Sequence, residues 1–155
     1  MPRVHLFGKE DCAIIVDTLD KTDLSHLKRF SLSAIKTQID DEGFIEIINR
    51  ISKIKSLEDV HICAAQTGLT SAIIDPLHSF IIDTKSHLKK FDVSLMWCMK
   101  IDEAKKKGFK SLLYDESSHL EEIGFDMVRT KRPPQEPTKE DIAEAKARVE
   151  KIAHH

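Results

Sequence analysis

His61 and Cys63 are the residues whose types and spacing could carry out chemistry. They stand two positions apart in the apolar run Val60-His61-Ile62-Cys63-Ala64, and side chains at that spacing on a strand share one face. Such a pair could supply two metal ligands, or a thiolate with a proton acceptor beside it. No second pair of the form C-x-x-C or H-x-x-x-H occurs in the sequence. We therefore expect no metal site and no cofactor, and the simpler interpretation of Cys63 is a small buried hydrophobic residue.

The polar turn that follows Cys63 is a second candidate, because it could bind an anion. It contains Gln66, Thr67 and Gly68, and either Thr67 or Thr70 could cap a helix that begins there. Free amides at a helix start, with two hydroxyls beside them, suit an anion, and the alternative is an ordinary capped turn. Ligands of open α/β sheets collect where strands end. By that rule the loops at 8–11, 100–102 and 115–117 are further candidates, and they add Lys9 and Asp115 as ligand-binding residues.

The same turn also carries the one likeness to a known family. From Cys63 to Gly68 it resembles the cysteine loop of small DsrE-like sulfur-relay domains, which implies a thiol that handles sulfur. No glycine-rich phosphate loop and no G-x-S-x-G elbow occurs in the sequence, so neither nucleotide binding nor serine hydrolysis is indicated. Whether the protein is an enzyme stays open, and the expectation leans against it.

The composition indicates one soluble globular domain. The chain has 155 residues, with 24 Lys and Arg, 26 Asp and Glu, 5 Gly, 5 Pro and 3 Cys. A net charge of -2 argues against coating nucleic acid or an anionic membrane, and the lysines between residues 85 and 110 are interpreted as a solvated surface. An odd number of cysteines indicates reduced thiols and a cytoplasmic location. No apolar stretch approaches the roughly 18 residues of a membrane span.

Hydropathy periods predict alternating strands and helices. A spacing of two predicts strands at 3–7, 59–65 and 91–99, the last buried on both sides with Trp97 in the core. A helical spacing predicts helices at 10–20, 43–56 and 101–107, with helical material at 69–90, whereas 22–38 fits either element. Gly108 and Gly124 each precede an apolar residue, as at the end of a helix. They predict strands at 110–114 and 125–130 around a short helix at 118–123.

This alternation predicts an α/β domain over residues 1–130. Its sheet would be mixed or mostly parallel, with about five strands and helices on both faces. A Pro-rich linker at 131–137 would lead to an amphipathic helix at 138–155. That helix carries apolar residues at the spacing of a coiled-coil seam, namely Ile142, Ala145, Val149 and Ile152. His154 and His155 resemble the remainder of a purification tag.

A short isolated helix is marginal in water, so its apolar stripe needs a surface. That surface could be the protein's own sheet, a second copy or another protein. We therefore expect a non-catalytic interaction or accessory module that docks on a protein partner or forms a homo-oligomer through this helix. Nucleic acid and membrane are not expected partners. The alternative is a small-molecule-binding or cysteine-dependent sulfur-handling enzyme that uses the loop around Cys63.

Overall fold

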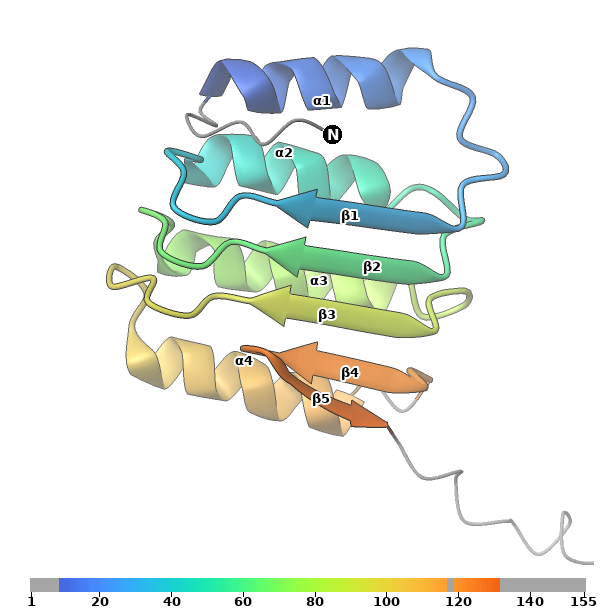
Figure 1. Cartoon of the computed structure of the whole chain (residues 1–155). Helices are drawn as coiled ribbons and strands as arrows, with labels where there is room; N and C mark the ends of the chain where they lie inside the picture. The colour runs from blue at the N-terminus through green and yellow to red at the C-terminus, as the bar shows by residue number, and fades with distance from the viewer. Residues whose placement is uncertain (1–8, 117–118, 132–155) are drawn as a thin grey trace, which may run out of the picture.

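The computed structural model describes residues 9–116 and 119–131, and these form an α/β fold (Figure 1). The elements are α1 (Lys9–Lys21), β1 (Arg29–Ser33), α2 (Asp41–Ile51), β2 (Asp59–Cys63), the 3-10 turn η1 (Ser71–Ile73), α3 (Ile74–Asp83), β3 (Lys90–Ser94), α4 (Glu103–Glu116), β4 (Glu122–Phe125) and β5 (Val128–Lys131). The predicted α/β class and the mixed sheet of five strands are confirmed. The ambiguous segment 22–38 contains strand β1.

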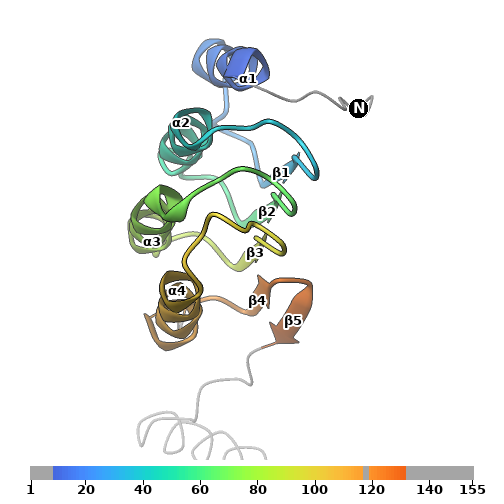
Figure 2. The ribbon, with the colours of Figure 1, turned by 90° about the vertical axis from the view of Figure 1, so that its left-hand side faces the viewer.

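The strands stand in the sheet in the order in which they occur in the sequence. The first four are parallel, and β5 is antiparallel to β4. The described helices all cover the same face of the sheet (Figure 2), which corrects the expectation of helices on both faces. When every connection steps to the next strand in one direction, right-handed crossovers place each helix on the same side. Helices reach both faces only where the strand order reverses.

One structural unit recurs along the chain. The parallel strands begin at residues 29, 59, 90 and 122, so a unit of strand, turn and helix repeats every 30 to 32 residues. Each unit has a leucine followed by apolar residues three and five positions later: Leu27, Phe30 and Leu32; Leu57, Val60 and Ile62; Leu88, Phe91 and Val93; Leu120, Ile123 and Phe125. Units of this kind that rest one on the next form a solenoid.

Backbone hydrogen bonds join equivalent positions of neighbouring units. The carbonyl of Lys28 accepts from the amide of Glu58 at 2.9 Å, and the carbonyl of Glu58 accepts from the amide of Lys89 at 2.8 Å. The carbonyl of Lys89 accepts in turn from Glu121 at 2.7 Å. The hydrophobic core lies between this stacked sheet and the single helix layer. Each unit is therefore stabilised by the units on either side of it.

The first unit is less well covered than the later ones. Leu27 and Phe30 are only partly buried, whereas their equivalents in the next three units, Leu57, Leu88 and Leu120 and Val60, Phe91 and Ile123, are at most 2 % exposed. Within the described residues no strand pairs with the outer edge of β1. The core is therefore thinner at this end of the solenoid.

Three predicted elements in the second half of the chain are wrong. Residues 110–114 lie in α4, because Phe109 and Leu113 are both buried one helical turn apart, and Gly108 lies inside that helix rather than at its end. The predicted helix at 118–123 overlaps β4, which begins at Glu122. The predicted strand at 125–130 is two strands, because the chain reverses between β4 and β5.

Strand β3 is shorter than the predicted run 91–99. It ends at Ser94, and the chain then turns with Trp97 at a φ of 58°. This turn breaks the period of two, so Trp97 lies outside the core and Cys98 is buried. The thiol of Cys98 donates to the carbonyl of Ala64 at 3.1 Å. The predicted strand at 3–7, the linker beyond Lys131 and the helix at 138–155 lie outside the described residues.

Two helical glycines are expected to respond in opposite ways to alanine. A Cβ on Gly43 in α2 would lie 2.6 Å from Sγ of Cys12 in α1, so Gly43→Ala should lower the free energy of unfolding by about 1–3 kcal/mol. A Cβ on Gly108 would meet no described atom within 4 Å, so Gly108→Ala should raise it by about 1 kcal/mol. Urea denaturation of both variants measures this. An unchanged or higher free energy of unfolding for Gly43→Ala would contradict the close approach of α1 to α2.

Candidate functional site

The face of the sheet opposite the helices carries mainly polar side chains in three rows. We call this face of the sheet the open face. Each row consists of residues that pair with one another across neighbouring strands. The rows are Arg29, Asp59, Lys90, Glu122 and Lys131; Ser31, His61, Asp92, Gly124 and Arg129; and Ser33, Cys63 and Ser94. None of the described helices covers this face (Figure 2).

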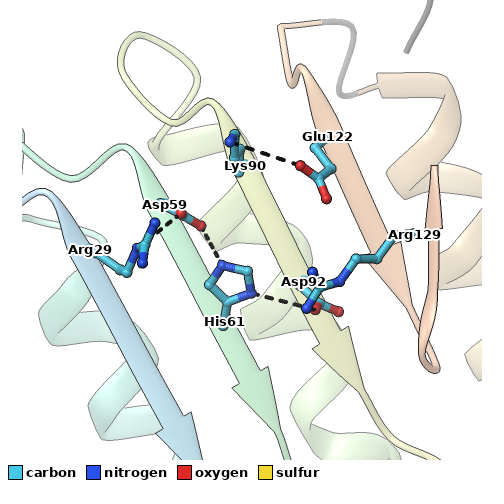
Figure 3. A network of polar contacts seen from close by, with 7 residues as sticks. All are labelled: Arg29, Asp59, His61, Lys90, Asp92, Glu122 and Arg129. Atoms are coloured by element: carbon cyan, nitrogen blue, oxygen red, sulfur yellow. Dashed lines mark hydrogen bonds and ion pairs between the residues drawn. The ribbon is translucent and has the colours of Figure 1, made fainter. Parts of the chain in front are cut away.

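His61 lies on the open face between two carboxylates (Figure 3). Its Nε2 is 2.7 Å from Oδ1 of Asp59, and its Nδ1 is 3.4 Å from Oδ2 of Asp92. Asp59 accepts from Nε of Arg29 at 3.2 Å. Asp92 lies 3.5 Å from a terminal nitrogen of Arg129. A chain of polar contacts thus runs across the sheet from β1 to β5.

Gly124 makes room for the central carboxylate of this chain. A Cβ at this position would lie 2.6 Å from Cγ of Asp92, which is closer than any side chain tolerates. Gly124 pairs with Arg129 across the β4–β5 hairpin. The absence of a side chain on β4 therefore lets Asp92 and Arg129 meet over this strand.

The predicted pair His61 and Cys63 shares the open face, but the two side chains do not interact with each other. Both ring nitrogens of His61 face carboxylates, and no hydrogen bond joins His61 to the half-buried thiol of Cys63. Burial first and the charge of Asp40 second raise the pKa of the Cys12 thiol to about 11. Cys12 is therefore a neutral thiol at neutral pH. A reactive Cys63 stays a prediction.

The anion site predicted in the turn after β2 is filled by the protein's own carboxylate. Thr70 caps η1, because its hydroxyl accepts from the amide of Ala72 at 3.2 Å. The amide and the hydroxyl of Thr70 donate to the two carboxylate oxygens of Asp41 at 2.8 and 2.6 Å. Thr67 is buried, and its hydroxyl donates to the carbonyl of Ala64 at 2.9 Å. Asp41 belongs to α2 in the preceding unit, so the carboxylate of one unit binds the turn of the next unit.

The structure does not bring the other predicted ligand-binding residues together. Gln66 is exposed in the turn after β2, and Gly68 lies beside the amino group of Lys100. Lys9 begins α1. Residues 110–114 are helical, so Asp115 lies near the end of α4 and not in a loop after a strand. Helix α4 and helix α1 lie at opposite ends of the helix layer (Figure 1). The docking residues Ile142, Ala145, Val149 and Ile152 lie outside the described residues.

Exposed apolar side chains gather in the turns that leave the carboxyl ends of the strands. Ile35 follows β1, Trp97 and Met99 follow β3, and Met127 follows β4; we call these four the apolar rim. Their exposed fractions are 47, 61, 87 and 72 %. Trp97 is the only tryptophan of the chain. Exposed tryptophan and methionine near one edge of a fold are typical of surfaces that bind a partner.

Trp97 occupies a backbone position that a tryptophan rarely adopts. Lys36, Gln66 and Trp97 stand at equivalent places in three successive turns, with φ of 56°, 56° and 58°. This left-handed region costs a residue with a Cβ roughly 1–2 kcal/mol. Backbone hydrogen bonds hold these turns. The amide of Lys36 donates to the carbonyl of Ala65 at 3.0 Å, and the amide of Gln66 donates to the carbonyl of Met96 at 2.8 Å. The left-handed conformation is thus common to the three turns, and in the third turn it displays an exposed tryptophan.

The β4–β5 hairpin shows the same combination of strain and exposure. Asp126 and Met127 form its two-residue turn, with φ of 49° and 72°, the pattern of a type I′ turn. The carboxylate of Asp126 accepts from the amide of Leu95 at 2.7 Å and lies 2.9 Å from Nζ of Lys106. These contacts fix the hairpin against β3 and α4 and present Met127 to solvent.

Comparison with known proteins finds no family model that matches the chain and no curated protein sequence that matches it.

In residues 9–116 and 119–131, no helix is both long and apolar enough to cross a membrane. The same residues contain no group of three or more His, Cys, Asp or Glu side chains that could hold a metal ion.

The charged residues of the open face were not predicted from the sequence, although a signal for them is present there. In each of the first three strands the polar residues recur at a spacing of two: Arg29, Ser31 and Ser33; Asp59, His61 and Cys63; Lys90, Asp92 and Ser94. This alternation predicts a strand with one solvated face. Interpreting the strand after Lys90 as buried on both sides concealed it.

Proposed function

We propose that the protein is a non-catalytic binding module that docks a protein partner on its open face and apolar rim. The observation that carries the proposal is Trp97, which is 61 % exposed and held in a strained turn beside an uncovered polar sheet. This is the interaction module expected from the sequence, with a different docking surface. Docking through the helix at 138–155 stays a separate prediction.

The arrangement of side chains matches the usual anatomy of a protein interface. Tryptophan and methionine are enriched among residues that anchor a partner, and polar side chains commonly surround them. The uncovered faces of solenoid proteins are extended binding surfaces. The competing enzyme hypothesis has less support, because His61 is engaged by Asp59 and Asp92 and does not contact Cys63.

Selection of random peptides displayed on phage tests the proposal without knowledge of the natural partner. Peptides selected on the full chain are expected to lose about tenfold or more in affinity for the Trp97→Ser variant, as when a central aromatic anchor is removed. Ile82→Ser is the matched control, because Ile82 is an exposed apolar residue, 44 %, on α3 in the helix layer. It should leave the affinity unchanged.

The fluorescence of Trp97 gives an independent measurement, because no other tryptophan contributes. A bound peptide should shift its emission to shorter wavelength, since the indole leaves water. Selected peptides that bind equally well to Trp97→Ser, and that do not shift the emission of the unmodified chain, would refute docking at the rim.

A further inference from the structure

We infer that the partner contacts the open face through an acidic protein segment, an inference that rests on the proposed function. The row that begins at the amino ends of the four parallel strands and continues to the last residue of the antiparallel β5 alternates in sign: Arg29, Asp59, Lys90, Glu122 and Lys131. In the next row Arg129 lies against Asp92. The cations and the carboxylates of these rows differ in how far they reach into solvent.

The cations project from the open face and the carboxylates lie close to it. The side chains of Arg29, Lys90 and Arg129 are 70, 46 and 62 % exposed. Their partners Asp59, Glu122 and Asp92 are 13, 22 and 20 % exposed. A molecule that approaches this face therefore meets guanidinium and ammonium groups first, above carboxylates that are already paired.

The two arginines keep hydrogen-bond donors for a partner. Arg29 uses its Nε towards Asp59 at 3.2 Å, and Arg129 places one terminal nitrogen 3.5 Å from Asp92. The remaining donors of both guanidinium groups make no hydrogen bond within the described residues. An arginine fork pairs best with the two oxygens of a carboxylate or a phosphate. The chemistry presented to a partner is thus that of an anion receptor.

An acidic protein segment fits this receptor better than a nucleic-acid backbone does. A phosphate chain laid across the strands would pass over Asp59, Asp92 and Glu122 between the cations. A nucleic-acid backbone also carries its phosphate charges at a regular, close spacing, which the alternating signs of the row from Arg29 to Lys131 do not match. Carboxylates on separate side chains can meet Arg29 and Arg129 individually, and neighbouring apolar side chains of the same segment can reach the rim.

The probe for this inference is poly-L-glutamate, titrated at low salt into the full chain and into two double variants. Arg29→Gln with Arg129→Gln should weaken binding about tenfold, because exposed charges steer and hold an oppositely charged partner. Lys21→Gln with Arg50→Gln is the matched control. It also removes two ion-paired cations, but from the helix layer, where Lys21 pairs with Asp17 and Arg50 pairs with Asp20. The control should change binding less than about twofold.

A third double variant guards against misfolding. Arg29→Lys with Arg129→Lys keeps both charges and removes the planar forks, so it should bind poly-L-glutamate with an affinity between those of the unmodified chain and the glutamine variant. Equal losses in the glutamine variant and in the helix-layer control would overturn the inference. Binding of oligodeoxythymidylate as tight as that of poly-L-glutamate would also overturn it.

The peptides selected on the unmodified chain separate this inference from the proposed function. Peptides that need Trp97 and carry a clear acidic excess support both. Peptides that need Trp97 but are neutral or basic would overturn the acidic partner and leave the binding module standing. Acidic peptides that bind the Trp97→Ser variant as tightly as the unmodified chain would instead refute docking at the rim. The inference of an acidic partner on the open face would then stand.

Discussion

Phe91→Ala is expected to lower the free energy of unfolding by about 3–5 kcal/mol, the range for a buried phenylalanine. Phe91 is 1 % exposed, and its ring lies 5.6 Å from that of Phe80 in α3. Phe30→Ala, at the equivalent position of the first unit, should cost roughly half as much, because Phe30 is only partly buried and less area leaves water. Urea denaturation monitored by circular dichroism measures both.

The comparison stays informative if Phe91→Ala fails to fold. Leucine at the same two positions removes less volume, and the order of the two losses should be unchanged. Equal losses at Phe30 and Phe91 would show that the first unit is covered as well as the inner ones. That result would contradict the thin core described at the β1 end of the solenoid.

Met127→Gly is expected to stabilise the protein and to weaken partner binding. Glycine at the second position of the hairpin turn removes the cost of a Cβ at a φ of 72°, so the free energy of unfolding should rise by roughly 1 kcal/mol. Loss of an exposed methionine from the apolar rim should lower the affinity for selected peptides about tenfold. In this one variant, the free energy of unfolding measured by denaturation should therefore rise, and the affinity measured by peptide titration should fall.

Met127→Ala is the control for this variant, because alanine removes the methionine side chain but keeps a Cβ. It should lose the same affinity with no gain in stability. Destabilisation by Met127→Gly would contradict the type I′ turn. Unchanged peptide affinity in both variants would remove Met127 from the docking surface.

Short-range patterns in the sequence were sufficient for the elements that a single apolar period defines. The helix predicted at 10–20 is α1, that at 43–56 overlaps α2, and the strand predicted at 59–65 contains β2. In each of these the apolar residues keep one spacing from end to end, so one face is buried throughout. The sequence predicts such elements because burial itself imposes the period.

The arrangement of these elements could not be predicted in the same way. The recurring leucines at 27, 57, 88 and 120 are the signal of a solenoid, but each pattern supplies few fixed positions among about thirty variable ones. Without the repeat, alternation of strands and helices fits several sheet orders. Only the sequential order places all helices on one face and leaves the other face open.

The candidate site was least predictable where apolar residues are exposed. Trp97 fits a buried strand by spacing, since Phe91, Val93 and Leu95 precede it at intervals of two. The period ends at Leu95 because the chain enters a left-handed turn, and no single-sequence signal marks a tryptophan in such a turn. Periodicity alone therefore assigns such an exposed apolar residue to the core.

The backbone bonds that tie each turn to the turn of the next unit have a consequence for association. Lys36 is held by Ala65, and Gln66 by Met96, so the segments that display the apolar rim are ordered before any encounter. A loop that orders on contact loses roughly 1–2 kcal/mol of conformational entropy per residue, and a rim already ordered by stacking avoids that loss. For the docking surface proposed above, preorganisation of this kind would lower the entropic cost of binding.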